Sequence, residues 1–198
     1  MKQNQFLAEK TFIFADGHHS HTNYVRGTSK WTDKSKCRDF DTVEEMNACL
    51  IKSINDTVPE DATLFHLGDW SFGKKENVKI FRDQVNCKDV HFMYGNHDFS
   101  VLKDPSLQKL FTRCDHYREI YSKGQMFVLF HYALRVFNQG HHGAINLYAH
   151  SHGTLPPIGR SLDVGWDVFH RPLSLDEIVD MLKDVPPLMV DHHTEETH

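Results

Sequence analysis

Five short apolar segments, each followed closely by Asp, Asn or His, constrain the fold of this 198-residue chain more than any other feature. Short apolar runs bounded by polar residues are typical of buried strands. The carboxyl ends of strands in α/β sheets meet at one edge, so we expect the polar side chains that follow them to assemble there. The segments are FIFAD ending at Asp16, LFHLGD at Asp69, VHFMYGNHD at Asn96, His97 and Asp98, MFVLFH at His131, and INLYAHSH at His150 and His152.

The rest of the chain alternates between strand and helix patterns, which predicts an α/β or α+β fold. Thr42 and Glu45 form a capping-box pattern, and apolar residues then recur at helical spacing as far as Pro59, which should end that helix. Ser174 and Glu177 form a second capping box before a final helix. Strands are expected at 11–15, 62–67, 90–94, 126–130, 145–148 and 162–164, and further helices at 75–86 and 107–111. We expect one domain over residues 1–185 and a flexible tail over 186–198.

Composition excludes several classes of protein. The net charge of −5 and the pI near 6.3 argue against a general polyanion binder, so no obligate nucleic-acid partner is expected. No apolar run approaches the roughly 20 residues that span a bilayer, and the amino terminus lacks an apolar signal core. We therefore expect a cytoplasmic protein without a membrane partner. Its thiols should be reduced, because no CxxC pair occurs among Cys37, Cys49, Cys87 and Cys114.

Histidine is unusually frequent, with 16 residues. Imidazole suits Zn, Fe or Ni, and carboxylate suits Mn or Mg. Each Asp or His taken alone is more often a structural or surface residue than a metal ligand. Their joint occurrence after successive predicted strands indicates a metal site.

The polar residues also form an ordered set of motifs. In chain order these are Asp16-x-His18, Gly68-Asp69, Gly95-Asn96-His97-Asp98, His131 and His150-x-His152. The set resembles the signature of the calcineurin-like metallophosphoesterases, D-x-H, G-D, G-N-H-D/E, H and G-H-x-H, and it spans nearly the whole chain. The small bacterial and phage members are the most similar. The resemblance implies two mixed β-sheets packed face to face and flanked by helices, a four-layer sandwich.

The resemblance also implies a site for two divalent ions per chain. Manganese is expected, with iron, zinc, nickel or cobalt as alternatives. Two close cations need an anionic bridge, and a hydroxide held between them would attack the phosphorus of a phosphate ester. The implied ligands are Asp16, His18 and His152 for the first ion, Asn96, His131 and His150 for the second, and Asp69 for both.

The resemblance assigns His97 and Asp98 to catalysis. His97 would face the phosphate and the leaving group, where an imidazolium can stabilise charge or donate a proton, and Asp98 would orient it. The alternative for Asp98 is a residue that forms a turn. His21 falls where relatives often carry a further histidine, so it should either support the ligands from behind or lie near the phosphate. His19 should be turned away and dispensable.

One position departs from the family pattern. Ala149 stands where the family has glycine, which would permit close approach or a positive φ. We expect a slight shift of the backbone there rather than loss of the ligand His150.

The substrate is less constrained than the chemistry. Arg38 and Arg135 are candidate phosphate clamps, because guanidinium binds phosphate with two hydrogen bonds. Tyr132 and the other aromatic residues near the motifs could stack a nucleobase, although core or rim positions are the commoner use of such residues. A nucleotide-like phosphate ester is therefore a possible partner, and the oligomeric state is not predicted.

Three functions remain open. The first is a phosphoesterase, for which diesters are favoured because no large cap would enclose the site. A phosphomonoesterase or nucleotidase is a variant of it, and a nuclease would use the basic loop between Arg26 and Arg38. The last is a non-catalytic scaffold with the same fold, which the complete set of ligands disfavours.

Overall fold

The computed structural model describes residues 4–187 and 189, and these form two mixed β-sheets. The first sheet has the order β4 (Arg113–Asp115), β3 (Asp89–Met93), β2 (Thr63–His66), β1 (Thr11–Phe14) and β9 (Leu173–Ser174). The second has the order β5 (Tyr117–Ser122), β6 (Gln125–Phe130), β7 (Ile145–Tyr148) and β8 (Ser161–Asp163). Only β9 and β5 run antiparallel to their neighbours. The carboxyl ends of β1, β2 and β3 therefore share one edge, as do those of β6, β7 and β8.

The two sheets pack face to face over a shared apolar layer. Side chains alternate along a strand, so Ile13 of β1 points to the opposite face from its neighbours Phe12 and Phe14. Ile13 packs in one cluster with Phe127 and with other apolar residues of both sheets. Phe12 and Phe14 pack instead with the helices outside the first sheet. Because β1 is buried on both faces, its sequence is a continuous apolar run rather than an alternating one.

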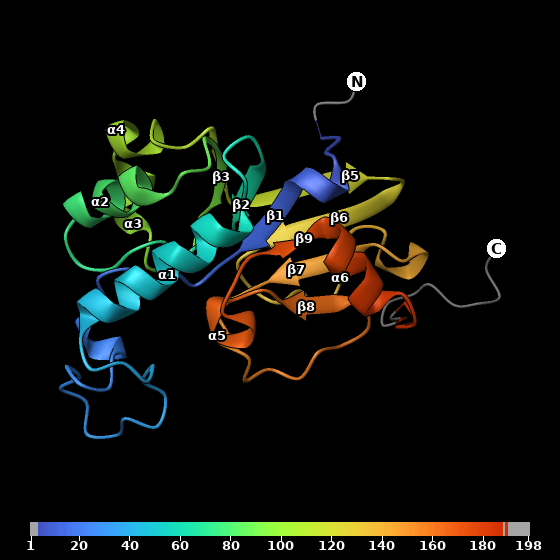
Figure 1. Ribbon diagram of the computed structural model, residues 1–198. Helices are drawn as coiled ribbons and strands as arrows, with labels where there is room; N and C mark the ends of the chain where they lie inside the picture. The colour runs from blue at the N-terminus through green and yellow to red at the C-terminus, as the bar shows by residue number, and fades with distance from the viewer. Residues whose placement is uncertain (1–3, 188, 190–198) are drawn as a thin grey trace.

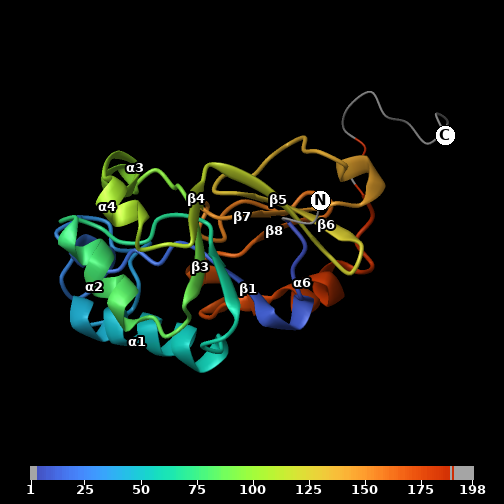
Figure 2. The same cartoon turned by 90° about the horizontal axis from the view of Figure 1, so that it is seen from above.

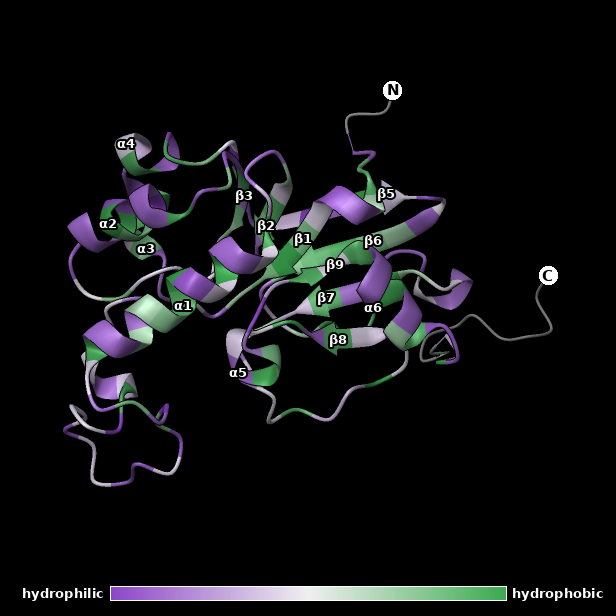
Figure 3. Ribbon diagram, viewed as in Figure 1, coloured by the Kyte–Doolittle hydropathy of each residue, from purple (hydrophilic) through white to green (hydrophobic). Residues whose placement is uncertain are grey.

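Helices cover the outer face of the first sheet. Helix α1 (Val43–Thr57) begins at the predicted capping box, and its buried residues Leu50 and Ile54 join the same cluster as α2 (Glu76–Gln84). Figures 1 and 2 place these helices on one side of the molecule and β5 to β8 on the other, and Figure 3 shows apolar residues concentrated on the central strands. The remaining helices are η1 (Ala8–Lys10), η2 (Thr22–Tyr24), α3 (Phe99–Lys103), α4 (Pro105–Gln108), η3 (Gly140–His142), α5 (Trp166–Phe169) and α6 (Leu175–Leu182).

The outer face of the second sheet is covered differently. Met126 and Val128 of β6 pack there against Leu134, Phe137 and Ala144, which belong to the segment between β6 and β7. The predicted arrangement of two mixed sheets with helices outside is confirmed. On this side, however, the covering layer consists mainly of a loop with the short helix η3.

Most predicted elements are present, and the differences have local causes. The helix expected at 107–111 is displaced to Pro105–Gln108, and α3, β4, β5 and β9 were not predicted. In β5 the buried positions are Arg118, Ile120 and Ser122, so two of its three inward side chains are polar. The apolar alternation that would mark a strand is therefore absent. The tail expected to be flexible falls mostly outside the described residues. Within residues 4–187 and 189, no helix is long and apolar enough to cross a membrane.

The core contains one ionisable residue with a testable effect on stability. His66 of β2 is fully buried against the rings of Phe14, Trp70 and Phe92. Its Nδ1 accepts a hydrogen bond from the Gly68 N–H, and its Nε2 has no partner among the described residues. Burial lowers the pKa of His66 to about 3. The unfolded chain binds a proton near pH 6.5, which the folded chain excludes.

The folded chain should therefore lose stability as the pH falls from 6.5 towards 3, by about 1.4 kcal/mol per pH unit for this residue. A His66→Gln variant removes that contribution. Urea unfolding in EDTA at pH 6 and pH 5 should show a smaller loss of unfolding free energy in the variant than in the parent chain. Equal losses in the two proteins would contradict the assignment of a neutral, buried His66.

Candidate metal centre

The predicted ligands follow the strand ends in strained backbone conformations. Five of the seven have a positive φ, between 49° and 66°. This region costs a non-glycine residue about 1 to 2 kcal/mol, and such strain clusters at functional sites. The side chains are therefore held in place by tight turns rather than by regular structure. The five residues are Asp16, His18, Asp69, His150 and His152.

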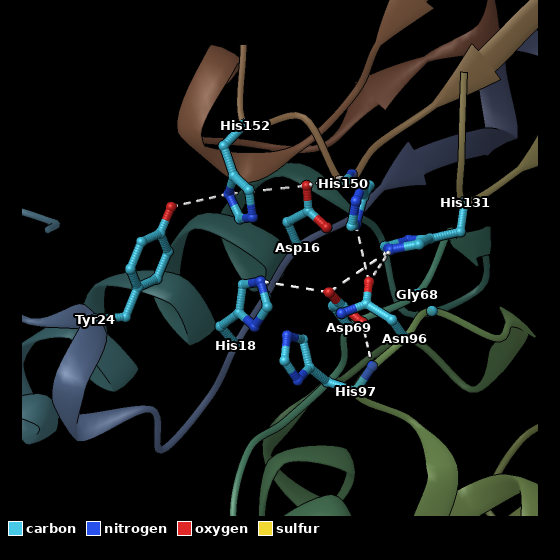
Figure 4. A network of polar contacts seen from close by, with 12 residues as sticks. Asp16, His18, Tyr24, Gly68, Asp69, Asn96, His97, His131, His150 and His152 are labelled. Atoms are coloured by element: carbon cyan, nitrogen blue, oxygen red, sulfur yellow. Dashed lines mark hydrogen bonds and ion pairs between the residues drawn. The ribbon is translucent and has the colours of Figure 1, made fainter. Parts of the chain in front are cut away.

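Two groups of side chains could each hold a metal ion, and each group takes members from both sheets. The first group is Asp16 and His18, which follow β1, with His152, which follows β7. Asp16 and His18 are buried, and Asp16 Oδ2 accepts a hydrogen bond from the His150 backbone N–H at 3.0 Å. Figure 4 shows the three side chains pointing towards a common space.

The second group is Asp69, His131 and His150, which follow β2, β6 and β7. Asn96 also belongs here, because its Oδ1 lies 3.0 Å from His131 Nε2 and 2.9 Å from His150 Nδ1. Asp69 and His131 are buried, whereas His150 is exposed. The structure thus brings together the four residues expected around the second ion.

The carboxylate of Asp69 lies between the two groups. Its Oδ2 is 3.6 Å from His18 Nε2 and 3.6 Å from His131 Nε2, one imidazole from each group. Its Oδ1 accepts a hydrogen bond from the His97 backbone N–H at 2.9 Å. This is the position that a carboxylate bridging two cations would need.

Two buried atoms of the first group lack a hydrogen-bond partner within the part of the chain that the structure describes, and a bound cation could take the place of such a partner. Asp16 Oδ1 and His18 Nδ1 are buried without a hydrogen-bond partner among the described residues. Burial, together with neighbouring carboxylates such as that of Asp69, raises the pKa of Asp16 to about 8. A buried carboxyl group that is costly to ionise alone is stabilised as the anion by a metal ion.

His131 gives independent support for a cation. Its Nδ1 donates to the Leu67 carbonyl at 2.8 Å, and burial lowers the pKa of the ring, which favours the neutral form. In that form Nε2 carries a lone pair, which faces the Asn96 Oδ1 lone pairs at 3.0 Å. The imidazole nitrogen and the amide group are thus close enough to bind the same cation.

Glycines let the chain pass close to the site. Gly68 has φ +98°, and a Cβ there would lie 2.6 Å from Gly95 N. A Cβ on Gly95 would lie 2.3 Å from Asp69 Oδ1. The departure at Ala149 is tolerated, because this residue is not among those with positive φ and its N–H donates to the His131 carbonyl at 2.9 Å.

Asp98 contacts the backbone around Asp69. Its buried carboxylate accepts hydrogen bonds from three backbone N–H groups, those of Asp69 at 2.6 Å, Trp70 at 3.1 Å and Gly95 at 2.8 Å. Burial and the Asp69 charge raise the pKa of Asp98 to about 7, although the three donors act to lower it. The contacts that the structure gives Asp98 are thus to the backbone that positions Asp69. These backbone contacts are the ones expected of a residue that forms a turn, which was the alternative role considered for Asp98.

The His97 side chain lies at the open side of the site. It is exposed, and its ring centroid is 5.4 Å from that of His18 and 5.3 Å from that of Phe72. His21 lies behind it, buried and stacked on Phe72 with centroids 3.7 Å apart. Burial above all lowers the pKa of His21 to about 4. His19 is turned away as expected, but it is buried and stacked on Phe81, so it belongs to the core.

The three remaining residues predicted to bind substrate lie in different surroundings. Tyr132 is 39% exposed, and its ring packs against His131 and His150 with centroids 4.9 and 4.7 Å away. Arg135 is exposed and lines a separate cavity beyond Tyr148. Arg38 is buried, and its guanidinium lies behind the Asp16 turn rather than beside the candidate ligands' open side.

Arg38 takes part in a network that the sequence did not predict. It donates to the backbone carbonyls of Asp16 at 2.6 Å and Gly17 at 2.8 Å, and to both oxygens of Asp167 at 2.8 Å. Asp167 in turn lies 2.7 Å from His152 Nδ1. Although burial opposes both shifts, these contacts lower the pKa of Asp167 and raise that of His152. A carboxylate behind a metal-binding histidine fixes its orientation and increases its basicity.

The same nitrogen of His152 also lies 2.9 Å from the Tyr24 hydroxyl. Tyr24 and Asp167 were missed by sequence reasoning. One signal could have found Asp167: it follows the strand predicted at 162–164, at the same sheet edge as the ligands.

Comparisons with known proteins agree with this architecture. The sequence matches none of the protein-family models. It is 29% identical over 185 residues to the uncharacterized protein MJ1445 of Methanocaldococcus jannaschii, covering 88% of this chain and 92% of that protein. The structure is similar to a protein of unknown function from Aquifex aeolicus, AQ665, with a TM-score of 0.60, 19% identity and coverage of 90% of this chain and 100% of that one. This chain therefore shares its two-sheet fold with that protein.

Two further solved structures are less similar. One is the nuclease MPE of Pseudomonas putida, with a TM-score of 0.44, 18% identity and coverage of 74% and 67% of the two chains. The other is YfcE, a phosphoesterase from E. coli, with a TM-score of 0.43, 15% identity and coverage of 78% and 77%.

The Asp167 contact yields a prediction about metal affinity. An Asp167→Asn variant should weaken binding at the site of Asp16, His18 and His152 by about 10- to 100-fold, the usual effect of losing such a partner. Binding at the Asp69 site should change little. Titration of the metal-free protein with Mn²⁺ would resolve the two affinities.

Asp176→Asn is the matched control, because Asp176 pairs with Lys123 on the surface, away from the site. Thermal unfolding of each variant would verify that it is folded. Equal weakening of both sites, or of neither, would be incompatible with a role for Asp167 in orienting His152.

Proposed function

We propose that this protein is a metal-dependent phosphoesterase that uses two divalent ions to hydrolyse phosphodiesters. The observation that carries the proposal is the position of the Asp69 carboxylate, 3.6 Å from an imidazole of each donor group. Separate structural sites would not need a shared anion, whereas a two-ion catalytic site does. The unpartnered, buried Oδ1 of Asp16 supports the same interpretation.

The chain would contribute the metal ligands and the residues that hold these ligands in place. Asp16, His18 and His152 would hold one ion, Asn96, His131 and His150 the other, and Asp69 both. Bound divalent ions would supply Lewis acidity towards phosphoryl oxygens and a water-derived nucleophile at neutral pH. Asp98 fixes the Asp69 backbone, and Asp167 fixes His152, so both groups are oriented before substrate arrives.

His97 is the residue proposed to face the leaving group. Its ring is exposed at the mouth of the site beside His18, and its backbone N–H holds Asp69. An imidazolium there can stabilise the charge that develops on the phosphate or donate a proton to the departing oxygen. Asp16, His18, Asp69 and His131 are buried, so an ester would approach from the side where His97 is exposed.

Exposure of the site favours diesters over monoesters. Asn96, His97 and His150 are all exposed, so a substrate group could extend on either side of the phosphorus. The nuclease alternative depended on the basic loop, in which Arg26 pairs with Asp39 and Arg38 is buried. Fewer free cations remain there than the sequence implied.

Hydrolysis of bis-p-nitrophenyl phosphate tests the proposed function. The metal-free chain should be inactive, and added Mn²⁺ should restore turnover. An Asp69→Asn variant should lose about a hundredfold or more of kcat/KM and bind both ions more weakly, because metal stabilisation of charge is worth several kcal/mol. Asp176→Asn is the surface control.

Failure to hydrolyse any of several phosphate esters with Mn, Fe, Zn, Ni or Co would refute the proposal. If the saturated protein also held fewer than two ions per chain, the scaffold alternative would gain. A higher kcat/KM for p-nitrophenyl phosphate than for the diester would favour a monoesterase.

A His97→Ala variant separates catalysis from metal binding. Its metal content should equal that of the parent chain, because the His97 ring is not among the candidate ligands. Its turnover should fall by about 10²- to 10⁴-fold, the usual contribution of acid–base assistance. Unchanged turnover at full metal content would remove His97 from the mechanism.

A further inference from the structure

Two clefts flank the candidate metal centre. The large cleft has a volume of about 690 Å³, and its lining includes His150 and His152 together with Tyr24, Trp31, Lys36 and Leu155. The small cleft has a volume of about 230 Å³, and its lining includes Asn96 together with Tyr94, Phe99, Leu102 and Tyr132. Each cleft therefore ends at side chains that belong to the candidate centre.

The two clefts adjoin at His150, which contacts two residues of the small cleft. His150 of the large cleft lies 2.9 Å through its Nδ1 from Asn96 Oδ1 of the small cleft. The Tyr132 ring of the small cleft packs on the His150 ring, with centroids 4.7 Å apart. A phosphorus atom bound at the metal centre would thus lie next to both clefts.

Both clefts present exposed aromatic faces. In the large cleft, Trp31 is 42% exposed, whereas Trp70 and Trp166 are almost fully buried. The Trp31 ring is kept in place by Tyr24 and His21, with centroids 6.3 and 6.0 Å away. An exposed, supported indole is a surface on which a flat ring can stack.

The small cleft repeats this arrangement on the other side. Phe99 is 60% exposed and Tyr132 is 39% exposed, and both rings line the cleft. The Phe99 ring also contacts Lys103, whose Nζ lies 4.0 Å from the ring centroid, so a base would stack on the part of the ring that Lys103 leaves exposed. Apolar rings exposed to this extent are not explained by core packing. They provide a second surface for a flat ring, of a size suited to one ring system and little more.

The clefts differ in charge. Lys36 lines the large cleft together with Asp167, whose carboxylate is paired with Arg38. The residues that line the small cleft include Asp98 but no Lys or Arg. An additional phosphate is therefore favoured in the large cleft. Aromatic rings alone would also bind a cationic group, such as the quaternary ammonium of a lipid headgroup. The positive charge of Lys36 disfavours such a group in the large cleft.

We propose that the substrate of the phosphoesterase proposed above is a diester joining two nucleosides, with one base stacked in each cleft. The large cleft takes the base on Trp31 and a second phosphate at Lys36. The small cleft takes the other base between Phe99 and Tyr132. The diester phosphorus lies between them at the metal centre.

Binding of thymidine compounds in EDTA tests the proposal without hydrolysis. The probes are the dinucleotide TpT, its 5′-phosphorylated form pTpT, and the mononucleotide pT. Trp31→Ala should weaken binding of all three by about tenfold or more, as expected for loss of base stacking. Phe99→Ala should weaken TpT and pTpT but leave pT, which fits the large cleft alone, within twofold.

Matched controls separate local from general effects. Tyr117→Ala removes an aromatic ring with the same 42% exposure as Trp31, and Ile80→Ala removes an apolar side chain 49% exposed on α2. Lys36→Glu should weaken pTpT several-fold more than TpT. Lys34→Glu is its control, because Lys34 lies in the same loop, donates to the Arg26 carbonyl and does not line the cleft.

The outcomes distinguish this inference from the proposed function. If the chain hydrolyses bis-p-nitrophenyl phosphate with Mn²⁺ but the Trp31, Phe99 and Lys36 variants bind every probe within twofold of their controls, the nucleotide assignment is wrong and the phosphoesterase remains. If no phosphate ester is hydrolysed with any metal, the proposed function fails whatever the affinities. Loss of affinity in these variants, with the controls unchanged, supports the two subsites.

Discussion

The buried carboxylate of Asp98 is the contact on which the geometry of the site depends. It accepts hydrogen bonds from the backbone of Asp69, Trp70 and Gly95, and so ties the loop after β2 to the loop after β3. Asp69 is held in a left-handed conformation there, with its carboxylate between two imidazoles. Three backbone donors on one buried anion leave the loop few alternatives, so the strain of the Asp69 turn can persist.

The candidate ligands could be predicted from the sequence because their signal is local. Each follows an apolar run long enough to be a buried strand, and parallel strands bring their carboxyl ends to one edge. The structure places Asp16, Asp69, Asn96, His131 and His150 together as this rule requires. The expected architecture of two mixed sheets is confirmed for the same reason, since the apolar strands of each sheet could be recognised individually.

The supporting residues could not be predicted, because their partners are distant in the sequence. Arg38 reaches Asp167 across 129 positions, and a buried arginine paired in this way looks in the sequence like any other cation of a basic loop. Asp98 could not be assigned from its motif alone, since a turn former and an orienter of His97 have the same sequence. In β5 the inward position of Arg118 removed the apolar alternation that would have identified the strand.

Both donor groups are assembled from the two sheets together: Asp16, His18 and Asp69 come from the first, and His131, His150 and His152 from the second. Neither sheet alone can present a complete group. An ion bound to either group would therefore link ion binding thermodynamically to docking of the sheets, and would cross-link the two halves of the sandwich. If the proposed ions bind there, a cell that limits the supply of metal would also limit the lifetime of the folded protein.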